Sequence, residues 1–108
     1  MDVECCEIVV TDADPERLVA LTRTLVEERL VACGQHVTAV RSVYRWAGEV
    51  HDEPEARVAL HTRRALVDAV VARVVELHGY DVPCVLALPV LGGNPAYLRW
   101  IADQTREG

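Results

Sequence analysis

The chain has 108 residues, 11 of them basic and 17 acidic, so its formal charge is −6, and 51% of its positions are hydrophobic. This length suits one folded unit, and we expect residues 1–108 to form a single domain. Because the balance is acidic and no basic run occurs, nucleic acid is not an expected partner. No stretch approaches the roughly 18 apolar residues of a membrane helix, and residues 1–4 lack the positive charge of a secretion signal. We expect a cytoplasmic protein with no membrane partner.

The N-terminal third predicts a strand followed by a helix. Residues 5–11 read C-C-E-I-V-V-T, which favours a strand, and its side-chain alternation lets at most one of Cys5 and Cys6 face the core. Asp14 and Pro15 then supply a helix cap and a first-turn proline. Leucine and valine recur with helical spacing over residues 18–26, so we expect one amphipathic helix that ends before Gly34.

The middle of the chain predicts a long β-hairpin. Residues 37–46 and 50–62 alternate with period two on either side of a turn at residues 47–49. At about ten residues each, these strands exceed the usual five or six, so the end of the hairpin is expected to overhang the domain. The overhang bears Tyr44 and Trp46, and aromatic side chains there need a partner surface.

The last third predicts a helix, a strand and a second helix. An apolar stripe over residues 66–77 indicates a helix that closes at His78 and the glycine after it. A continuous apolar run over residues 84–91 favours a strand that is covered on both faces or lies on a buried edge. Asn94 is expected to cap a short terminal helix that carries Tyr97 and Trp100. The order is βαββαβ with a short C-terminal helix, which is the ferredoxin-like α+β pattern.

Catalytic signatures are weak in this sequence. No G-x-S-x-G motif occurs, and the glycine pair at residues 92–93 lacks the residues of a phosphate loop. The four cysteines, at positions 5, 6, 33 and 84, include no C-x-x-C pair, so free thiols are the default. Four histidines and these thiols are donors that suit copper or zinc, although none has ligand spacing. The simplest interpretation of His78 is a histidine that meets the last carbonyls of its helix.

Four segments together resemble the CutA divalent-cation tolerance family. They read L-V-E-E-R-L-V-A-C over residues 25–33, S-V-Y-R-W-A-G over 42–48, L-H-G-Y-D-V-P over 77–83 and L-P-V-L-G-G-N-P-A-Y-L-R-W over 88–100. The resemblance covers nearly the whole chain. It implies a ferredoxin-like protomer in a tight homotrimer whose long hairpins extend onto neighbouring subunits. It also implies a non-enzymatic role in tolerance of copper and other divalent cations, with no cofactor needed for folding.

The resemblance also indicates where a metal site differs from the family pattern. Copper sites proposed in bacterial members use a cysteine where this chain has Val10, and histidines at two positions of which only His78 matches. The family usually has lysine where this chain has His61 and glutamate where it has Cys84. Both changes add donors for soft metals. The candidate metal ligands are His78, His61, Cys84 and Cys33, and the candidate residues of the intersubunit cleft are Tyr44, Trp46, Tyr80 and Trp100.

Two other functions stay open. CutA trimers resemble PII-like signalling trimers, whose clefts between subunits bind nucleotides or other small effectors, so the chain is alternatively a ligand-sensing module. The absence of lysine weakens the nucleotide interpretation, while the arginines at positions 41, 45, 63 and 64 keep it open. A third hypothesis is a stable scaffold for a partner protein, for which the sequence has no specific feature.

Overall fold

The structure is a computed structural model that describes residues 3–108; part of the expectation about a secretion signal rests on residues 1–2, outside this range. Four strands form one antiparallel sheet in the order β2-β3-β1-β4. They are β1 (Cys5–Asp12), β2 (Cys33–Trp46), β3 (Glu49–Arg63) and β4 (Val85–Pro89), and the helices are α1 (Pro15–Glu27), the one-turn η1 (Arg64–Leu66), α2 (Val67–Leu77) and α3 (Pro95–Gln104). The predicted ferredoxin-like α+β order with a C-terminal helix is confirmed.

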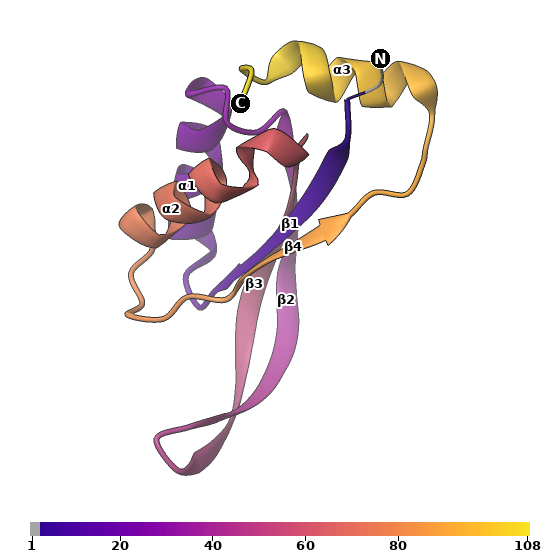
Figure 1. Ribbon diagram of the computed structural model, residues 1–108. Helices are drawn as coiled ribbons and strands as arrows, with labels where there is room; N and C mark the ends of the chain where they lie inside the picture. The colour runs from indigo at the N-terminus through magenta and orange to yellow at the C-terminus, as the bar shows by residue number, and fades with distance from the viewer. Residues whose placement is uncertain (1–2) are drawn as a thin grey trace.

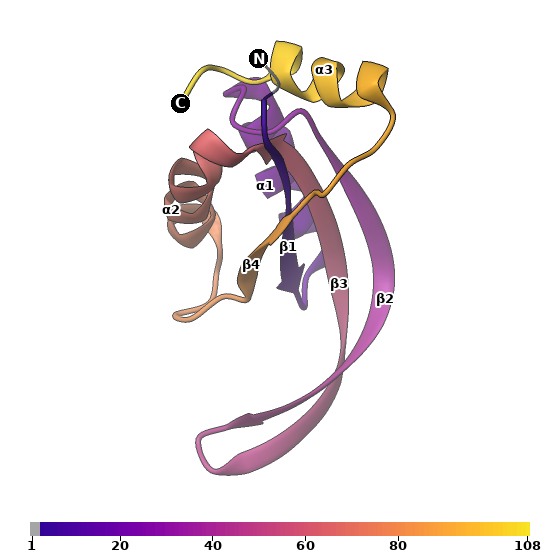
Figure 2. The same ribbon diagram turned by 45° about the vertical axis from the view of Figure 1, so that its right-hand side comes forward.

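Helices α1 and α2 lie side by side on one face of the sheet, and α3 crosses the end where β1 begins (Figures 1 and 2). Alternate residues of β1 and β3 point into the space beneath α1 and α2. The resulting core cluster contains Ile8, Val10, Leu18, Leu21, Leu25, Leu30, Val31, Ala56, Val58, Leu60, Leu66, Val70 and Val74. Over residues 3–108, no helix is long and apolar enough to cross a membrane.

The hairpin of β2 and β3 overhangs the sheet, as the strand lengths predicted. The last residue of β1, Asp12, pairs with Ala56, so the part of β3 before Ala56 has only β2 beside it. Pro54 lies in this edge segment, where a residue without an N–H group is tolerated. Ala47 and Gly48, both with positive φ, form the two-residue turn. The overhang makes the molecule 48 Å long and 22–24 Å in its other dimensions (Figure 2).

Four local expectations differ from the structure. Helix α1 ends at Glu27, well before Gly34, because Arg29 and not that glycine takes the left-handed conformation after the helix. Gly34 lies inside β2 instead, since that strand begins at Cys33. Strand β4 covers only Val85–Pro89 of the predicted run over residues 84–91, and it is mostly exposed in the single chain. Cys5 and Cys6 are both buried, because α3 covers the face that Cys5 occupies.

Candidate functional site

A polar cluster lies on the sheet face opposite α1 and α2. Cys33, the first residue of β2, pairs with His61 of β3, and His61 pairs with Glu7 of β1. The core-facing neighbours of His61 are Leu60 and Thr62, so strand alternation directs His61 to the opposite face. Tyr97 of α3 reaches the same place and stacks edge-on against the His61 ring, with centroids 5.7 Å apart. Four elements thus bring one thiol, one imidazole, one carboxylate and one phenol together.

The distances within this cluster are short. The Cys33 Sγ atom lies 3.5 Å from His61 Nδ1 and 3.3 Å from the Tyr97 hydroxyl oxygen. That hydroxyl lies 2.6 Å from His61 Nδ1, and His61 Nε2 lies 2.9 Å from a carboxylate oxygen of Glu7. Cys33 Sγ, His61 Nδ1 and the Tyr97 oxygen therefore meet at one point, while Glu7 holds the other side of the imidazole.

The protonation of Tyr97 orders the hydrogen bonds. Burial, and then the hydrogen bond with Cys33, raise the pKa of Tyr97 to about 12. At neutral pH the phenol keeps its proton and donates it to His61 Nδ1, and we assign the ring proton of His61 to Nε2, which donates to Glu7. His61 Nδ1 then accepts the phenol proton, and Cys33 Sγ lies beside both the imidazole and the hydroxyl. An imidazole nitrogen and a cysteine thiolate are ligands of zinc and related divalent ions.

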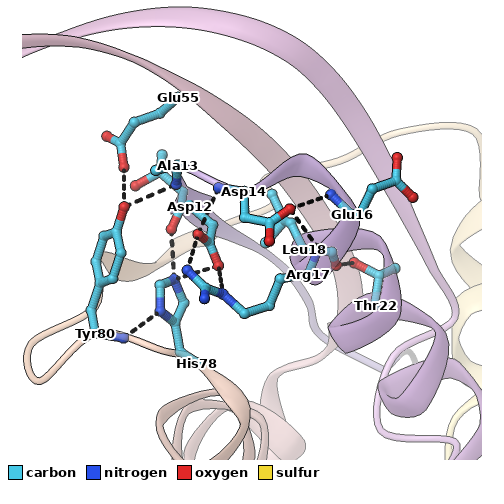
Figure 3. Close-up of polar contacts among 11 residues, drawn as sticks. Asp12, Ala13, Asp14, Glu16, Arg17, Leu18, Thr22, Glu55, His78 and Tyr80 are labelled. Carbon is cyan, nitrogen blue, oxygen red and sulfur yellow. Dashed lines mark hydrogen bonds and ion pairs between the residues drawn. The ribbon is translucent and has the colours of Figure 1, made fainter.

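His78 occupies a different environment at the far end of β1 (Figure 3). Its side chain is fully buried, its Nε2 lies 2.8 Å from the Thr11 carbonyl, and its Nδ1 accepts the N–H of Tyr80 at 3.1 Å. Both ring nitrogens are therefore used by the backbone, and His78 fixes the end of α2 against β1. This arrangement leaves no free lone pair on the ring for a metal ion.

Asp12 forms the polar centre of that end (Figure 3). Its buried carboxylate accepts hydrogen bonds from Arg17 Nε at 2.8 Å and Nη2 at 2.7 Å and from the N–H of Asp14 at 2.9 Å. Burial acts to raise the pKa of Asp12, but the hydrogen bonds from Arg17 and Asp14 and the nearby His78 outweigh it and lower the pKa. Tyr80 closes the cluster: its hydroxyl accepts the N–H of Ala13 at 2.9 Å and donates to Glu55 at 3.4 Å.

The four candidate metal ligands thus fall into two groups within one chain. Cys33 and His61 meet beside Glu7, whereas His78 lies beside Asp12, five residues or roughly 16 Å along β1. Cys84 is exposed and precedes Val85, which pairs with Val10 near the Asp12 end. Over residues 3–108, no three side chains of the His, Cys, Asp and Glu types converge as metal ligands.

The candidate cleft aromatics are also separated. Tyr44 and Trp46 lie on the overhanging hairpin, where Tyr44 stacks on His51 with centroids 5.2 Å apart and Trp46 is 55% exposed. Trp100 stacks on Tyr97 at 5.5 Å, beside the Cys33 cluster. Sequence reasoning missed Glu7 and Tyr97 as members of the site. The strand parity of Glu7 was a usable signal, whereas the place of Tyr97 depends on how α3 crosses the sheet.

A four-stranded antiparallel sheet with two helices on one face, and a thiol-imidazole cluster on the other, defines a ferredoxin-like α+β protein with soft-metal donors on its open face. Residues 6–104 match the family described as CutA1 divalent ion tolerance protein. The chain belongs to this family.

Individual proteins of the CutA family also match this chain in sequence and in structure. Divalent-cation tolerance protein CutA of Thermus thermophilus is 37% identical over 91% of this chain and 95% of that protein. Protein CutA 1, chloroplastic, of Oryza sativa is 40% identical over 93% of this chain, but the chain covers only 56% of that protein, and it spans about half of the matched plant and animal relatives. The crystal structure of CutA1 from Oryza sativa superposes with a TM-score of 0.95 at 38% identity, covering 99% and 98% of the two chains.

Proposed function

We propose that this chain acts in tolerance of divalent cations as a non-enzymatic homotrimer that binds a divalent metal ion in a cleft between protomers. The observation that carries the proposal is the uncovered apolar surface on the open sheet face. Leu86 and Leu88 point to that face from β4 and are 63% and 46% exposed. Exposed apolar surface of this kind marks an interaction site. If other copies of the chain cover it, the Cys33 cluster on the same face lies between protomers.

The hairpin supports the same assembly. Val43, Tyr44, Trp46 and Val50 are all exposed on its overhang. An isolated two-stranded hairpin is only marginally stable in water, so these side chains need a surface to pack against. A neighbouring protomer supplies that surface. The metal is cargo in this proposal, because the core cluster is apolar and complete without it.

Copper is one candidate ion, and the donor set also suits zinc. The position of the cysteine in proposed bacterial copper sites is held by Val10, which is fully buried in the core and has no donor atom. Cys33 and His61 are the better placed donors. A cytoplasmic location is part of the proposal. All four cysteines are free thiols, and the reducing cytoplasm keeps thiols in this state.

Two measurements test the proposal. Light scattering is expected to give about three times the chain mass of 12.0 kDa, and a species of that single mass contradicts the trimer. Growth of metal-sensitive cells in copper, zinc and cadmium tests tolerance: expression of the chain is expected to raise the tolerated concentration of at least one ion. No protection against any of the three ions contradicts the proposed role.

The contribution of the hairpin to assembly is tested by Trp46→Ala. We expect this change to shift the trimer toward smaller species at low micromolar concentration, because it removes a large exposed aromatic from the segment that contacts the neighbour. Sedimentation velocity measures the shift. Trp100→Ala is the control of equal chemistry, and we expect a smaller effect because Trp100 already packs on Tyr97 within its own chain. A trimer that is unaffected by Trp46→Ala contradicts the assignment.

The second candidate function is nucleotide or small-effector sensing. A groove of 750 Å³ between β4 and α2 contains Arg64, which supports this alternative. However, Arg64 pairs with Glu4 at 3.0 Å, and Asp68 also lines the groove, so a phosphate would meet two carboxylates. A thermal-shift screen of metals against nucleotides separates the two candidates, because a ligand that binds only the folded state raises the unfolding midpoint. A rise of the unfolding midpoint with nucleotides but not with metals favours the sensing function.

A further inference from the structure

We propose that Cys33 Sγ and His61 Nδ1 are the two protein ligands of one exchangeable tetrahedral divalent ion of the zinc class, with Glu7 as the residue that orients His61. This inference rests on the proposed divalent-metal function and names its site.

The separation of the two donors fits such an ion. A tetrahedral ion with a metal–sulfur bond of about 2.3 Å and a metal–nitrogen bond of about 2.0–2.1 Å places the two ligand atoms about 3.5–3.6 Å apart. The Cys33 Sγ and His61 Nδ1 atoms are 3.5 Å apart. The distance between the two donor atoms is therefore already the one that a tetrahedral ion requires, and binding needs no movement of either strand.

Glu7 fixes the orientation of the His61 imidazole through the second ring nitrogen. His61 Nε2 bonds to Glu7 at 2.9 Å, and the His61 side chain is only 13% exposed. A carboxylate on the second ring nitrogen sets the tautomer and raises the basicity of a metal-binding histidine. Cross-strand pairing of Glu7, His61 and Cys33 holds all three on adjacent strands, so the arrangement is built on the sheet and not on a loop.

Charge also favours a cation at this place. Arg63, the next residue of β3 on this face, turns away to bond Thr105 in the loop after α3 at 3.0 and 3.1 Å. Glu7 contributes a carboxylate beside the imidazole. Among the described residues, Tyr97 also contacts both donors, with its phenol oxygen 2.6 Å from His61 Nδ1 and 3.3 Å from Cys33 Sγ. Tyr97 therefore occupies the donors by hydrogen bonds until an ion displaces it.

Two protein ligands leave open coordination positions. Structural zinc sites are closed by four protein ligands, whereas other zinc sites keep a position open for water or another ligand. No third His, Cys, Asp or Glu joins the pair among the described residues. An open two-ligand site suits reversible binding of an ion as cargo.

The test is isothermal titration of the full-length protein with Zn(II). We expect one ion per protomer in the wild type, at least a 100-fold loss of affinity in Cys33→Ser and in His61→Gln, and a 10- to 100-fold loss in Glu7→Gln. Cys84→Ser removes an exposed thiol outside the cluster and is expected to bind like the wild type. Light scattering of each variant shows that the assembly is retained.

Co(II) gives a second readout, because a thiolate ligand adds a charge-transfer absorption in the near ultraviolet. We expect this band in the wild type and in Cys84→Ser, and its loss in Cys33→Ser. Wild-type protein that binds neither ion contradicts the divalent-metal function itself. Wild-type binding that Cys33→Ser and His61→Gln leave unchanged, or that Cys84→Ser removes, overturns only this assignment.

Discussion

Asp12→Ala is expected to lower the free energy of unfolding by about 3 kcal/mol. The Asp12 side chain is fully buried and accepts three hydrogen bonds, two from Arg17 and one from the N–H of Asp14. Its removal leaves these donors without their partner at the point where β1 passes into α1. The value lies at the low end for a broken buried ion pair, because Arg17 is 39% exposed and regains water.

The matched control is Asp52→Ala on the hairpin. Asp52 and Arg41 make the same two-bond pair, at 2.8 and 2.7 Å, but the Arg41 side chain is 80% exposed. Exposed pairs contribute little, so we expect no resolved change in the unfolding midpoint. Urea unfolding at one protomer concentration measures both variants, so that the contribution of assembly to the measured stability is the same for each. Equal losses in the two variants contradict the role assigned to burial.

The same carboxylate predicts a dependence on pH. Because the pKa of Asp12 is lowered from 3.8 on folding, the unfolded chain binds more protons near that pH than the native chain. The contribution of Asp12 is therefore complete well above pH 4 and declines as the pH falls through the native pKa. The difference in unfolding free energy between wild type and Asp12→Ala is expected to shrink from pH 6 to pH 3. A difference that stays constant over this range contradicts the native-state ionisation of Asp12.

Gly34→Ala is expected to destabilise the protein by about 1–3 kcal/mol. A Cβ atom at Gly34 would lie 2.5 Å from the Thr22 methyl group and 3.0 Å from side-chain atoms of Val58 and Leu60. All three neighbours belong to the packed region between α1 and the sheet, so none moves freely. The glycine is needed because β2 passes close to α1, and overpacking there forces the helix away from the sheet.

Two further variants test this cause. Thr22→Ser removes the methyl group in the closest contact, so the double variant is expected to recover part of the loss, which a double-mutant cycle measures. Gly92→Ala is the control, because nothing lies within 4 Å of its added Cβ atom and its φ is not positive. We expect it to change stability by less than about 0.5 kcal/mol. Failure of Thr22→Ser to recover any stability contradicts the steric explanation.

Local signals predicted much of the fold. Asp14 and Asn94 cap the helices that the sequence indicated, since a capping side chain acts on backbone N–H groups only two or three residues away. The alternation of Val58 and Leu60 with His61 correctly separated the two faces of β3. The length of the hairpin strands predicted the overhang. Gly34 was misread as a helix end, because a close approach between β2 and α1 is not visible in local sequence.

The candidate site was predicted only in part. His61 and Cys33 were named from residue type and family resemblance, but their pairing was not, and His78 and Cys84 lie at the other end of the sheet. Burial of His78, with both ring nitrogens bonded, depends on how α2 returns to β1.

The sequence by itself determined the order of the elements and the faces of the strands, because caps, turns and hydrophobic period act over a few neighbouring residues. It also determined the family, through the four segments that resemble it. Only the tertiary structure decided which donors meet. Cys33 and His61 are 28 residues apart, His61 and Tyr97 are 36 apart, and Glu7 and His61 are 54 apart. Contacts over such separations follow from strand register and from the crossing of α3, which are set by packing of the whole chain.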